Sequence, residues 1–202
     1  MHSQTDSWSR CTARSITLNG ASTAPFFMNR RNIYVVGLMA VGKSTVGKLI
    51  ADTLGMPFYD SDHEIEARAG AEVAWIFDVE GEDGFRQREE HVIDEITRMD
   101  GVVLATGGGV VKRQINRERL RSRGTVIHLH CPLQQLLERT AKDKKRPLLA
   151  GDDREEVLKN LMCERAPLYK EIEDYRFVSG ERGAKQLAHR IVKQLREDGL
   201  VD

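Results

Sequence analysis

The chain has 202 residues, with 31 Lys and Arg balanced by 31 Asp and Glu, and 40% of its residues are hydrophobic. This length supports one substantial core rather than two, and no apolar run approaches the length of a membrane span. The zero formal charge excludes a general field that would recruit nucleic acid or an anionic membrane, and three scattered cysteines without a C-x-x-C pair favour a cytoplasmic chain over a disulfide scaffold.

Residues 1–28 differ in composition from everything after them. Ser and Thr are frequent, Asp6 is the only acid, and Arg10 and Arg14 are the only strong bases. We expect a disordered extension, followed by a single domain over 29–202. An upstream start ahead of Met28 explains it, as does an acid-poor transit peptide; the absence of an amphipathic period favours the first.

The first predicted strand, 32–36, leads into a phosphate-binding pattern. The segment from Gly37 to Thr45 fits G-x-x-x-x-G-K-[ST], and an apolar-periodic helix is predicted over 43–54. Backbone N–H groups at a helix N-terminus attract phosphate, Lys43 adds a mobile charge, and the Ser44 hydroxyl can bind Mg²⁺. The alternative is a glycine-rich turn that contains Lys-Ser by chance. The candidate nucleotide-binding residues here are Ala40, Val41, Gly42, Lys43, Ser44 and Thr45.

Strand-like and helical patterns then alternate to the end of the chain. Further strands are predicted at 57–60, 102–105, 125–129 and 175–178, and further helices at 61–69, 72–98 with a break around Gly81–Gly84, 113–122, 132–141, 154–171 and 183–197. This order predicts one α/β domain, a parallel sheet with helices on both faces. Ligands of such sheets bind at the carboxyl ends of the strands.

Two carboxylates, Asp60 and Asp62, follow the second predicted strand. One could hold the water shell of a metal ion and the other could orient a hydroxyl nucleophile. The alternative is a helix N-cap, which explains one of the two acids but not both. We favour function for the pair.

A run of three glycines, Gly107, Gly108 and Gly109, follows the third predicted strand. Because adjacent glycines lose much conformational entropy on folding, a close approach of backbone to ligand explains them better than a casual loop. Arg86 and Arg165 lie in helical patterns, where arginine is usually a solvated surface residue. Composition alone therefore assigns neither arginine a function.

Other features carry weaker signals. His128 and His130 precede Cys131 on or just beyond a strand, a pattern that only weakly suggests a metal site. Trp75, Ile76 and Phe77 are typical of the apolar face of a helix, so we expect them in the core.

Together these motifs resemble the shikimate kinase family. The phosphate loop, Asp-Ser-Asp, Gly-Phe-Arg-x-Arg-Glu-Glu, Ala-Thr-Gly-Gly-Gly, Lys-Arg-Pro-Leu-Leu and Glu-Arg-Ala-Pro-Leu-Tyr occur in the family's order over roughly residues 31–197. The resemblance implies a fold like that of the nucleoside monophosphate kinases, a three-layer P-loop fold with a five-stranded parallel sheet of order 2-3-1-4-5. It also implies a substrate-binding segment at about 60–98 and a lid at about 140–155.

The resemblance implies transfer of the ATP γ-phosphoryl group to the 3-hydroxyl of shikimate, on the route to chorismate and the aromatic amino acids, by a monomer using ATP and Mg²⁺. The implied catalytic residues are Lys43, Asp62 and Arg146; Asp62, Arg86, Gly107, Gly108, Gly109 and Arg165 would bind shikimate, Ser44 and Asp60 the metal, and Arg139, Arg146 and Arg182 the nucleotide.

Two further functions stay open. One is a kinase for another small metabolite, such as gluconate or a nucleoside monophosphate, and the other is a nucleotide-binding module without catalysis. Support for the second comes from Ala40, because the family commonly has glycine at this position of the phosphate loop. If the position requires a positive φ, alanine would strain the loop by about 1 kcal/mol.

Overall fold

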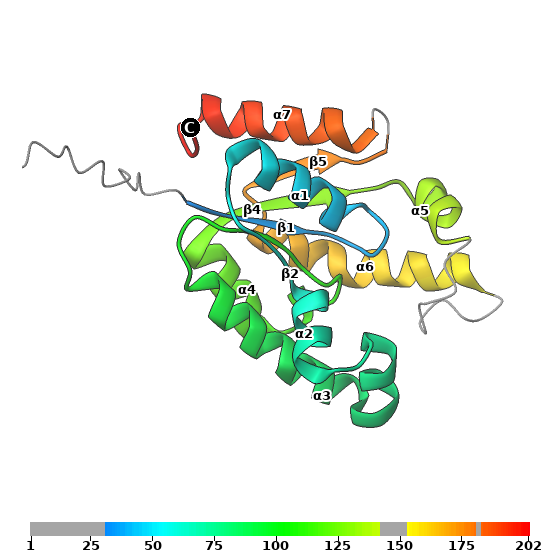
Figure 1. The fold of residues 1–202 in the computed structure, drawn as a ribbon. Helices are drawn as coiled ribbons and strands as arrows, with labels where there is room; N and C mark the ends of the chain where they lie inside the picture. Colours follow the sequence, from blue (N-terminus) through cyan, green and yellow to red (C-terminus); the bar gives the residue numbers. More distant parts are fainter. Residues whose placement is uncertain (1–30, 142–152, 181–182) are drawn as a thin grey trace, which may run out of the picture.

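The protein forms a five-stranded parallel sheet covered by helices on both faces (Figure 1). A computed structural model describes residues 31–141, 153–180 and 183–202. The predictions for residues 1–28, for most of the lid segment and for Arg146 and Arg182 lie outside these ranges. The strand order is β2-β3-β1-β4-β5, which confirms the order that the family resemblance implies.

The strands are short and, apart from the outer β2 and β5, almost completely buried. Their bounds are β1 Asn32–Val36, β2 Phe58–Asp60, β3 Val103–Ala105, β4 Gly124–His130 and β5 Tyr175–Val178. The central strand β1 pairs with β3 on one side and β4 on the other, so that Val35 faces Ala105 and Val36 faces His128. Burial on both faces explains the nearly continuous apolar runs in the sequence.

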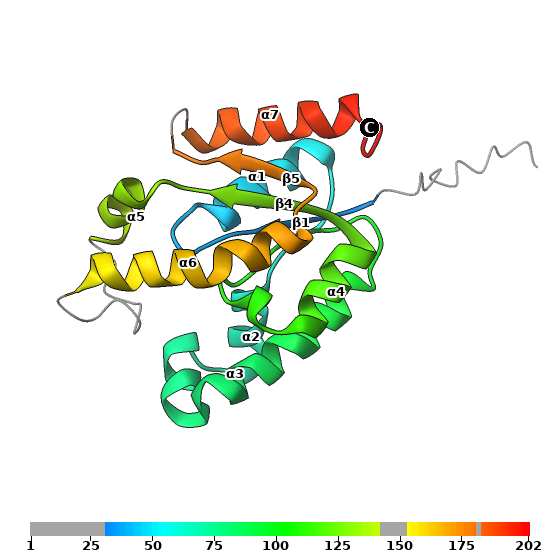
Figure 2. The same cartoon turned by 180° about the vertical axis from the view of Figure 1, so that it is seen from behind.

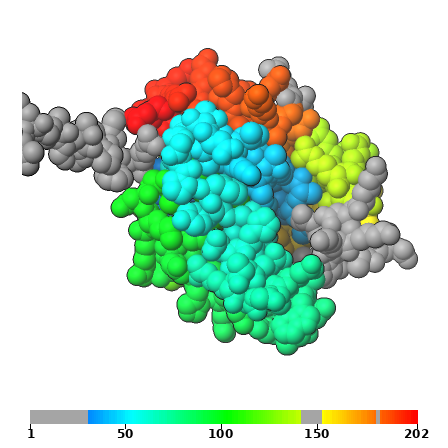
Figure 3. Space-filling view, in the orientation of Figure 1, coloured from blue at the N-terminus to red at the C-terminus, as the bar shows by residue number. Residues whose placement is uncertain are grey.

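The helices form one layer on each face of the sheet (Figures 1 and 2). Helices α1 (Lys43–Leu54) and α7 (Gly183–Glu197) pack side by side on one face, as Figure 3 also shows. Helices α4 (Gln114–Arg123) and α6 (Arg154–Ile172) cover the other, with α5 (Leu133–Thr140) against α6. Helices α2 (Ser61–Ala69) and α3 (Val73–Thr97) pack together beyond β2. None of the helices within the described ranges has the length and apolarity to cross a bilayer.

The predicted elements are confirmed, with local differences. Helix α3 contains a non-helical residue at Gly81 (φ 71°, ψ −178°), inside the predicted break. A short 3₁₀ helix, η1 (Val110–Lys112), was not predicted, because three residues carry no periodic signal. The prediction for Trp75 is wrong: Ile76 is buried, but Trp75 is 55% exposed, since it points away from the packed side of α3.

The phosphate loop joins β1 to α1, and three of its residues have a positive φ. Gly37 has φ 144°, Ala40 has φ 60°, and Gly42, which caps α1, has φ 95°. A Cβ on Gly37 would overlap the carbonyl oxygen of Leu129, so that position also requires glycine for space. Ala40 therefore adopts the conformation in which a side chain costs about 1 kcal/mol.

Replacing Ala40 with Gly should relieve this strain. We expect Ala40→Gly to raise the free energy of unfolding by about 0.5–1 kcal/mol, measured by urea denaturation, because the left-handed conformation is freely available to glycine. The matched control is Ala67→Gly on the exposed side of α2, which should lower stability by about 1 kcal/mol. A loss of stability in both variants would show that Ala40 is not strained.

Candidate active site

The parallel register brings the predicted functional segments to one edge of the sheet. Asp60 and Val35 both face Ala105, so the ends of β1, β2 and β3 are level. The phosphate loop, the Asp-Ser-Asp segment and the glycine run leave the sheet at this edge. Residues far apart in sequence therefore form one site.

On the phosphate side, hydrogen bonds hold the key side chains in place. The Lys43 ammonium is buried and donates a hydrogen bond to the Leu38 carbonyl at 2.8 Å, which holds it within the loop. The Ser44 hydroxyl donates to Asp60 Oδ2 at 2.5 Å. Asp60 Oδ1 accepts from the backbone N–H of Asp62 at 3.1 Å, so Asp60 is also the N-cap of α2. The N-cap and the predicted metal-binding role of Asp60 are therefore compatible.

A cavity of about 250 Å³ lies beside the phosphate loop. It is bounded by the loop residues Ala40 and Gly42, by Arg139 from α5 and by Gly180 and Leu187 near α7. Arg139 Nη1 donates to the Ala40 carbonyl at 3.1 Å and to Ser179 Oγ at 3.3 Å. The cavity offers an apolar wall and a planar cation next to the phosphate loop, which suits a nucleotide base.

Charged side chains lie against the backbone of the glycine run. A Cβ on Gly107 would lie 2.6 Å from Asp62 Oδ1 and 2.9 Å from Glu89 Oε1, and a Cβ on Gly109 would overlap the Arg86 guanidinium. Arg86 Nη1 donates to Glu89 Oε2 at 2.6 Å. Both side chains are buried, Glu89 completely. The interpretation of Arg86 as a solvated helix residue is therefore wrong.

Arg165 reaches the same glycine run from α6. Its Nη1 donates to the Gly108 carbonyl at 3.0 Å, and the Tyr169 hydroxyl donates to the same oxygen at 2.6 Å. Arg165 is only 4% exposed, which corrects the expectation of a solvated side chain. Arg86 and Arg165 thus converge from two helices on adjacent glycines.

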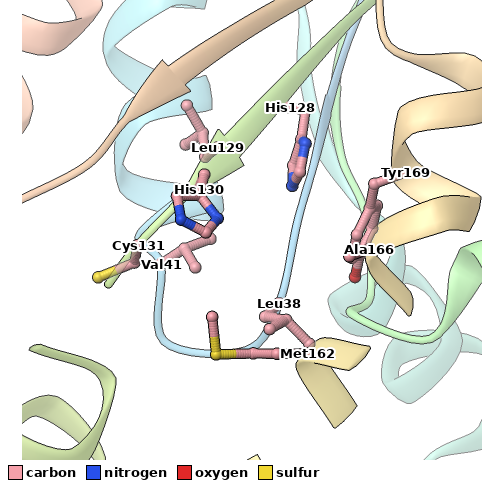
Figure 4. Close-up of a pocket in the computed structure, with 9 residues that line it drawn as sticks. All are labelled: Leu38, Val41, His128, Leu129, His130, Cys131, Met162, Ala166 and Tyr169. Atoms are coloured by element: carbon pink, nitrogen blue, oxygen red, sulfur yellow. The ribbon is translucent and has the colours of Figure 1, made fainter. Parts of the chain in front are cut away.

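His128 supports this arrangement from β4. Its ring stacks on Tyr169 with centroids 4.7 Å apart, and its Nδ1 lies 2.5 Å from Glu173 Oε2. An apolar cavity of about 50 Å³ lies between His128 and Tyr169 on one side and Leu38 of the phosphate loop and Met162 of α6 on the other (Figure 4). Within the described ranges, no three His, Cys, Asp or Glu side chains come together as a metal site.

The sequence-based predictions did not include Glu89, a fully buried carboxylate beside Arg86. Burial raises its pKa to about 7 despite the Arg86 guanidinium beside it, and the Asp62 carboxylate adds to the rise. Its Oε1 is buried without a hydrogen-bond partner in the structure. The sequence signal available was the i, i+3 spacing from Arg86 to Glu89 on one helix face.

The structure thus brings together Lys43, Ser44, Asp60, Asp62, Arg86 and Arg165 with the three glycines, and places Arg139 at the neighbouring cavity. The site pairs the phosphate loop with a neighbouring cluster of two arginines and two carboxylates around the glycine run. Two arginines suit an anionic ligand, and carboxylates suit its hydroxyl groups.

The raised pKa of Glu89 predicts a stability change with pH. Its folded pKa of about 7 lies above the ordinary value of 4.5, so the folded protein holds the proton more tightly than the unfolded chain. The contribution is therefore favourable at low pH and is lost as pH rises from 4.5 through 7, by on the order of 3 kcal/mol. Denaturation of wild type and Glu89→Gln at pH 5.5 and 7.5 measures it. We expect the variant to lose less stability than wild type over this interval; an equal loss in both would contradict the assignment.

Comparison with known proteins agrees with this geometry. The family model described as shikimate kinase matches residues 39–196. The shikimate kinase of Vibrio campbellii is 52% identical over 168 residues, covering 83% of this chain and 98% of the relative. Shikimate kinase 1 of an Enterobacter species is 53% identical and covers 82% of this chain and 96% of its own length.

Solved structures give the same result. A shikimate kinase from Acinetobacter baumannii, determined in complex with shikimate, is 45% identical with a TM-score of 0.81, covering 84% of this chain and 95% of that one. The shikimate kinase of Aquifex aeolicus is 36% identical with a TM-score of 0.73, covering 84% and 98%. With its sheet order, its phosphate loop and these relatives, the chain belongs to the shikimate kinase family.

Proposed function

We propose that this protein is a shikimate kinase, which transfers the γ-phosphoryl group of ATP to the 3-hydroxyl of shikimate and releases shikimate 3-phosphate and ADP. The observation that carries this proposal is the convergence of buried Arg86 and Arg165 on the glycine run, beside Asp62 and within reach of the phosphate loop. Family membership at about half sequence identity supports the same reaction.

The acceptor site suits a small carboxylic acid with several hydroxyl groups. Arg86 and Arg165 would bind the carboxylate, because guanidinium groups form bidentate hydrogen bonds with it. Asp62 would accept hydrogen bonds from ring hydroxyls, and the backbone of Gly107, Gly108 and Gly109 allows the ring to approach closely. A neutral sugar or a nucleotide base would not require two buried arginines here.

The phosphate loop would hold the triphosphate. Its N–H groups and Lys43 would contact the β- and γ-phosphates, and Arg139 would lie against the base. Arg146 and Arg182 keep their proposed roles at the phosphates and the base, although they lie outside the described residues. Ser44 and Asp60 fit Mg²⁺, since a hydroxyl and a carboxylate oxygen 2.5 Å apart are ligands that this hard cation prefers, Asp60 acting through water. When bound, Mg²⁺ would neutralise phosphate charge.

In the transfer, the acceptor oxygen bonds to the γ-phosphorus, the bond from phosphorus to the bridging ADP oxygen breaks, and the hydroxyl proton passes to Asp62. Positioning and charge neutralisation dominate such reactions, so Lys43 and Arg146 should contribute more than a base. Asp62 would then act first by orienting the hydroxyl. We further propose that the enzyme works as a monomer in the cytoplasm.

An ADP-release assay tests the substrate. We expect turnover with shikimate and little with quinate, gluconate or AMP. Arg86→Lys should raise the KM for shikimate about 10-fold or more with the KM for ATP unchanged, because lysine keeps the charge but loses the bidentate geometry. Arg88→Lys, two residues along and paired with Glu80 at the surface, is the control and should change neither KM. Turnover confined to gluconate or AMP would overturn the proposal.

Asp62→Asn tests the orienting and proton-accepting roles. We expect kcat to fall about 100-fold or more, since asparagine cannot take the hydroxyl proton and donates where a carboxylate accepts. Measured shikimate affinity separates the two roles: a weaker affinity indicates orientation, and an unchanged affinity with a low kcat indicates proton transfer. Near-normal turnover at normal affinity would exclude both.

A further inference from the structure

The Arg86 guanidinium is held by two glutamates at different edges. Nη1 donates to the buried Glu89 at 2.6 Å, whereas Nε and Nη2 both donate to Glu82 Oε1 at 3.3 Å. The Nε/Nη2 edge is one of the two edges of a guanidinium that can bind a carboxylate through two parallel hydrogen bonds. In this structure that edge is occupied by a carboxylate of the protein itself.

Glu82 also has a second cation as partner. Lys112 Nζ, from η1, lies 2.6 Å from Glu82 Oε1. The hydrogen bond from Lys112, together with the charges of Lys112 and Arg86, lowers the pKa of Glu82 despite the partial burial that opposes it. The side chain is therefore an anion at neutral pH, and one oxygen is shared between two cations.

We propose that Glu82 is an internal substitute for the substrate carboxylate: in the free enzyme it contacts both Lys112 and the Nε/Nη2 edge of Arg86, and when the acceptor binds it leaves Arg86 and keeps only Lys112. This inference rests on the proposed function, in which Arg86 binds the carboxylate of shikimate. Glu82 thereby sets how tightly the acid group of the acceptor is held.

Burial and distance identify Glu82, not Glu89, as the carboxylate that leaves. The side chain of Glu82 is 47% exposed and that of Glu89 is 0% exposed. The contact of Arg86 with Glu82 is also longer, 3.3 Å against 2.6 Å. Glu82 follows Gly81, the non-helical residue of α3, so its backbone lies at a break rather than within a regular turn.

The effect of removing Glu82 on shikimate binding distinguishes this proposal from a role in which Glu82 only positions Arg86. If Glu82 only orients Arg86, its loss should weaken shikimate binding. If Glu82 competes with shikimate, its loss should strengthen binding, because the apparent dissociation constant falls as the binding-competent fraction of the free enzyme rises. The sign of the change therefore decides between them.

The experiment is calorimetric titration of the full chain with shikimate. We expect Glu82→Gln to lower the dissociation constant about 3- to 10-fold, since a neutral amide competes less well for a guanidinium, while the KM for ATP stays the same. The control is Asp83→Asn, which removes the same charge from the next residue, whose 88% exposed side chain pairs with Arg113. It should change the dissociation constant less than twofold. Unchanged or weaker binding in Glu82→Gln overturns the proposal.

Lys112→Met gives an independent check. Without Lys112, Glu82 has only Arg86 as its partner among these cations, so shikimate binding should weaken. In the Glu82→Gln background the same substitution should have no effect. Additive effects of the two changes would indicate simple charge attraction and would contradict the proposal. Wild-type turnover of shikimate together with a raised KM in Arg86→Lys keeps the proposed function even if this inference fails.

Discussion

The absence of side chains at residues 107–109 is the constraint on which the candidate site depends. Directly after β3, this backbone lies against the Asp62 and Glu89 carboxylates at Gly107 and the Arg86 guanidinium at Gly109. The Gly108 carbonyl accepts hydrogen bonds from Arg165 and Tyr169. Side chains here would occupy the space that the charged groups use. Gly107 and Gly109 therefore leave room for the Asp62 and Glu89 carboxylates and the Arg86 guanidinium, and Gly108 lies close to the phosphate loop.

Burying so many charges is costly unless each is compensated. Arg86 is compensated by Glu89 and Glu82, and Arg165 by the Gly108 carbonyl. The sheet also supports the site, because His128 of β4 stacks on Tyr169 and lies within hydrogen-bond distance of Glu173. The raised pKa of Glu89 shows that compensation is incomplete in the free protein. Because a protonated Glu89 leaves the charges of Arg86 and Arg165 less well balanced, an anion bound to the two arginines would suit this state.

The phosphate side and the acceptor side differ in how far sequence could predict them. Lys43 and Ser44 belong to one contiguous pattern with a fixed geometry, and the apolar strands are buried on both faces, so loop and sheet could be read from local signals. Arg86 and Arg165 could not, because helical arginine is usually solvated and only the fold shows that these two are buried. The family resemblance supplied their roles.

Glu89, Glu82 and Tyr169 were missed for a similar reason. Glu89 is one of several glutamates on α3, and Glu82 and Lys112, which are 30 residues apart, meet only through packing. Tyr169 is recognised by its contact with Gly108, 61 residues away. For Ala40 the sequence raised the question of whether this position of the loop has a positive φ, and the backbone φ of 60° shows that it does.

Shikimate binding to Gly109→Ala is the most direct test of the central claim. Gly109 has φ −102°, which any residue can adopt, so the added methyl group tests space alone. Because its Cβ would overlap the Arg86 guanidinium, the shikimate dissociation constant should rise about tenfold or more, while ADP binding, which shows that the variant is folded, stays near the wild-type value. Unchanged shikimate affinity in this variant would contradict the view that the glycine run makes room for the arginine that binds the acceptor.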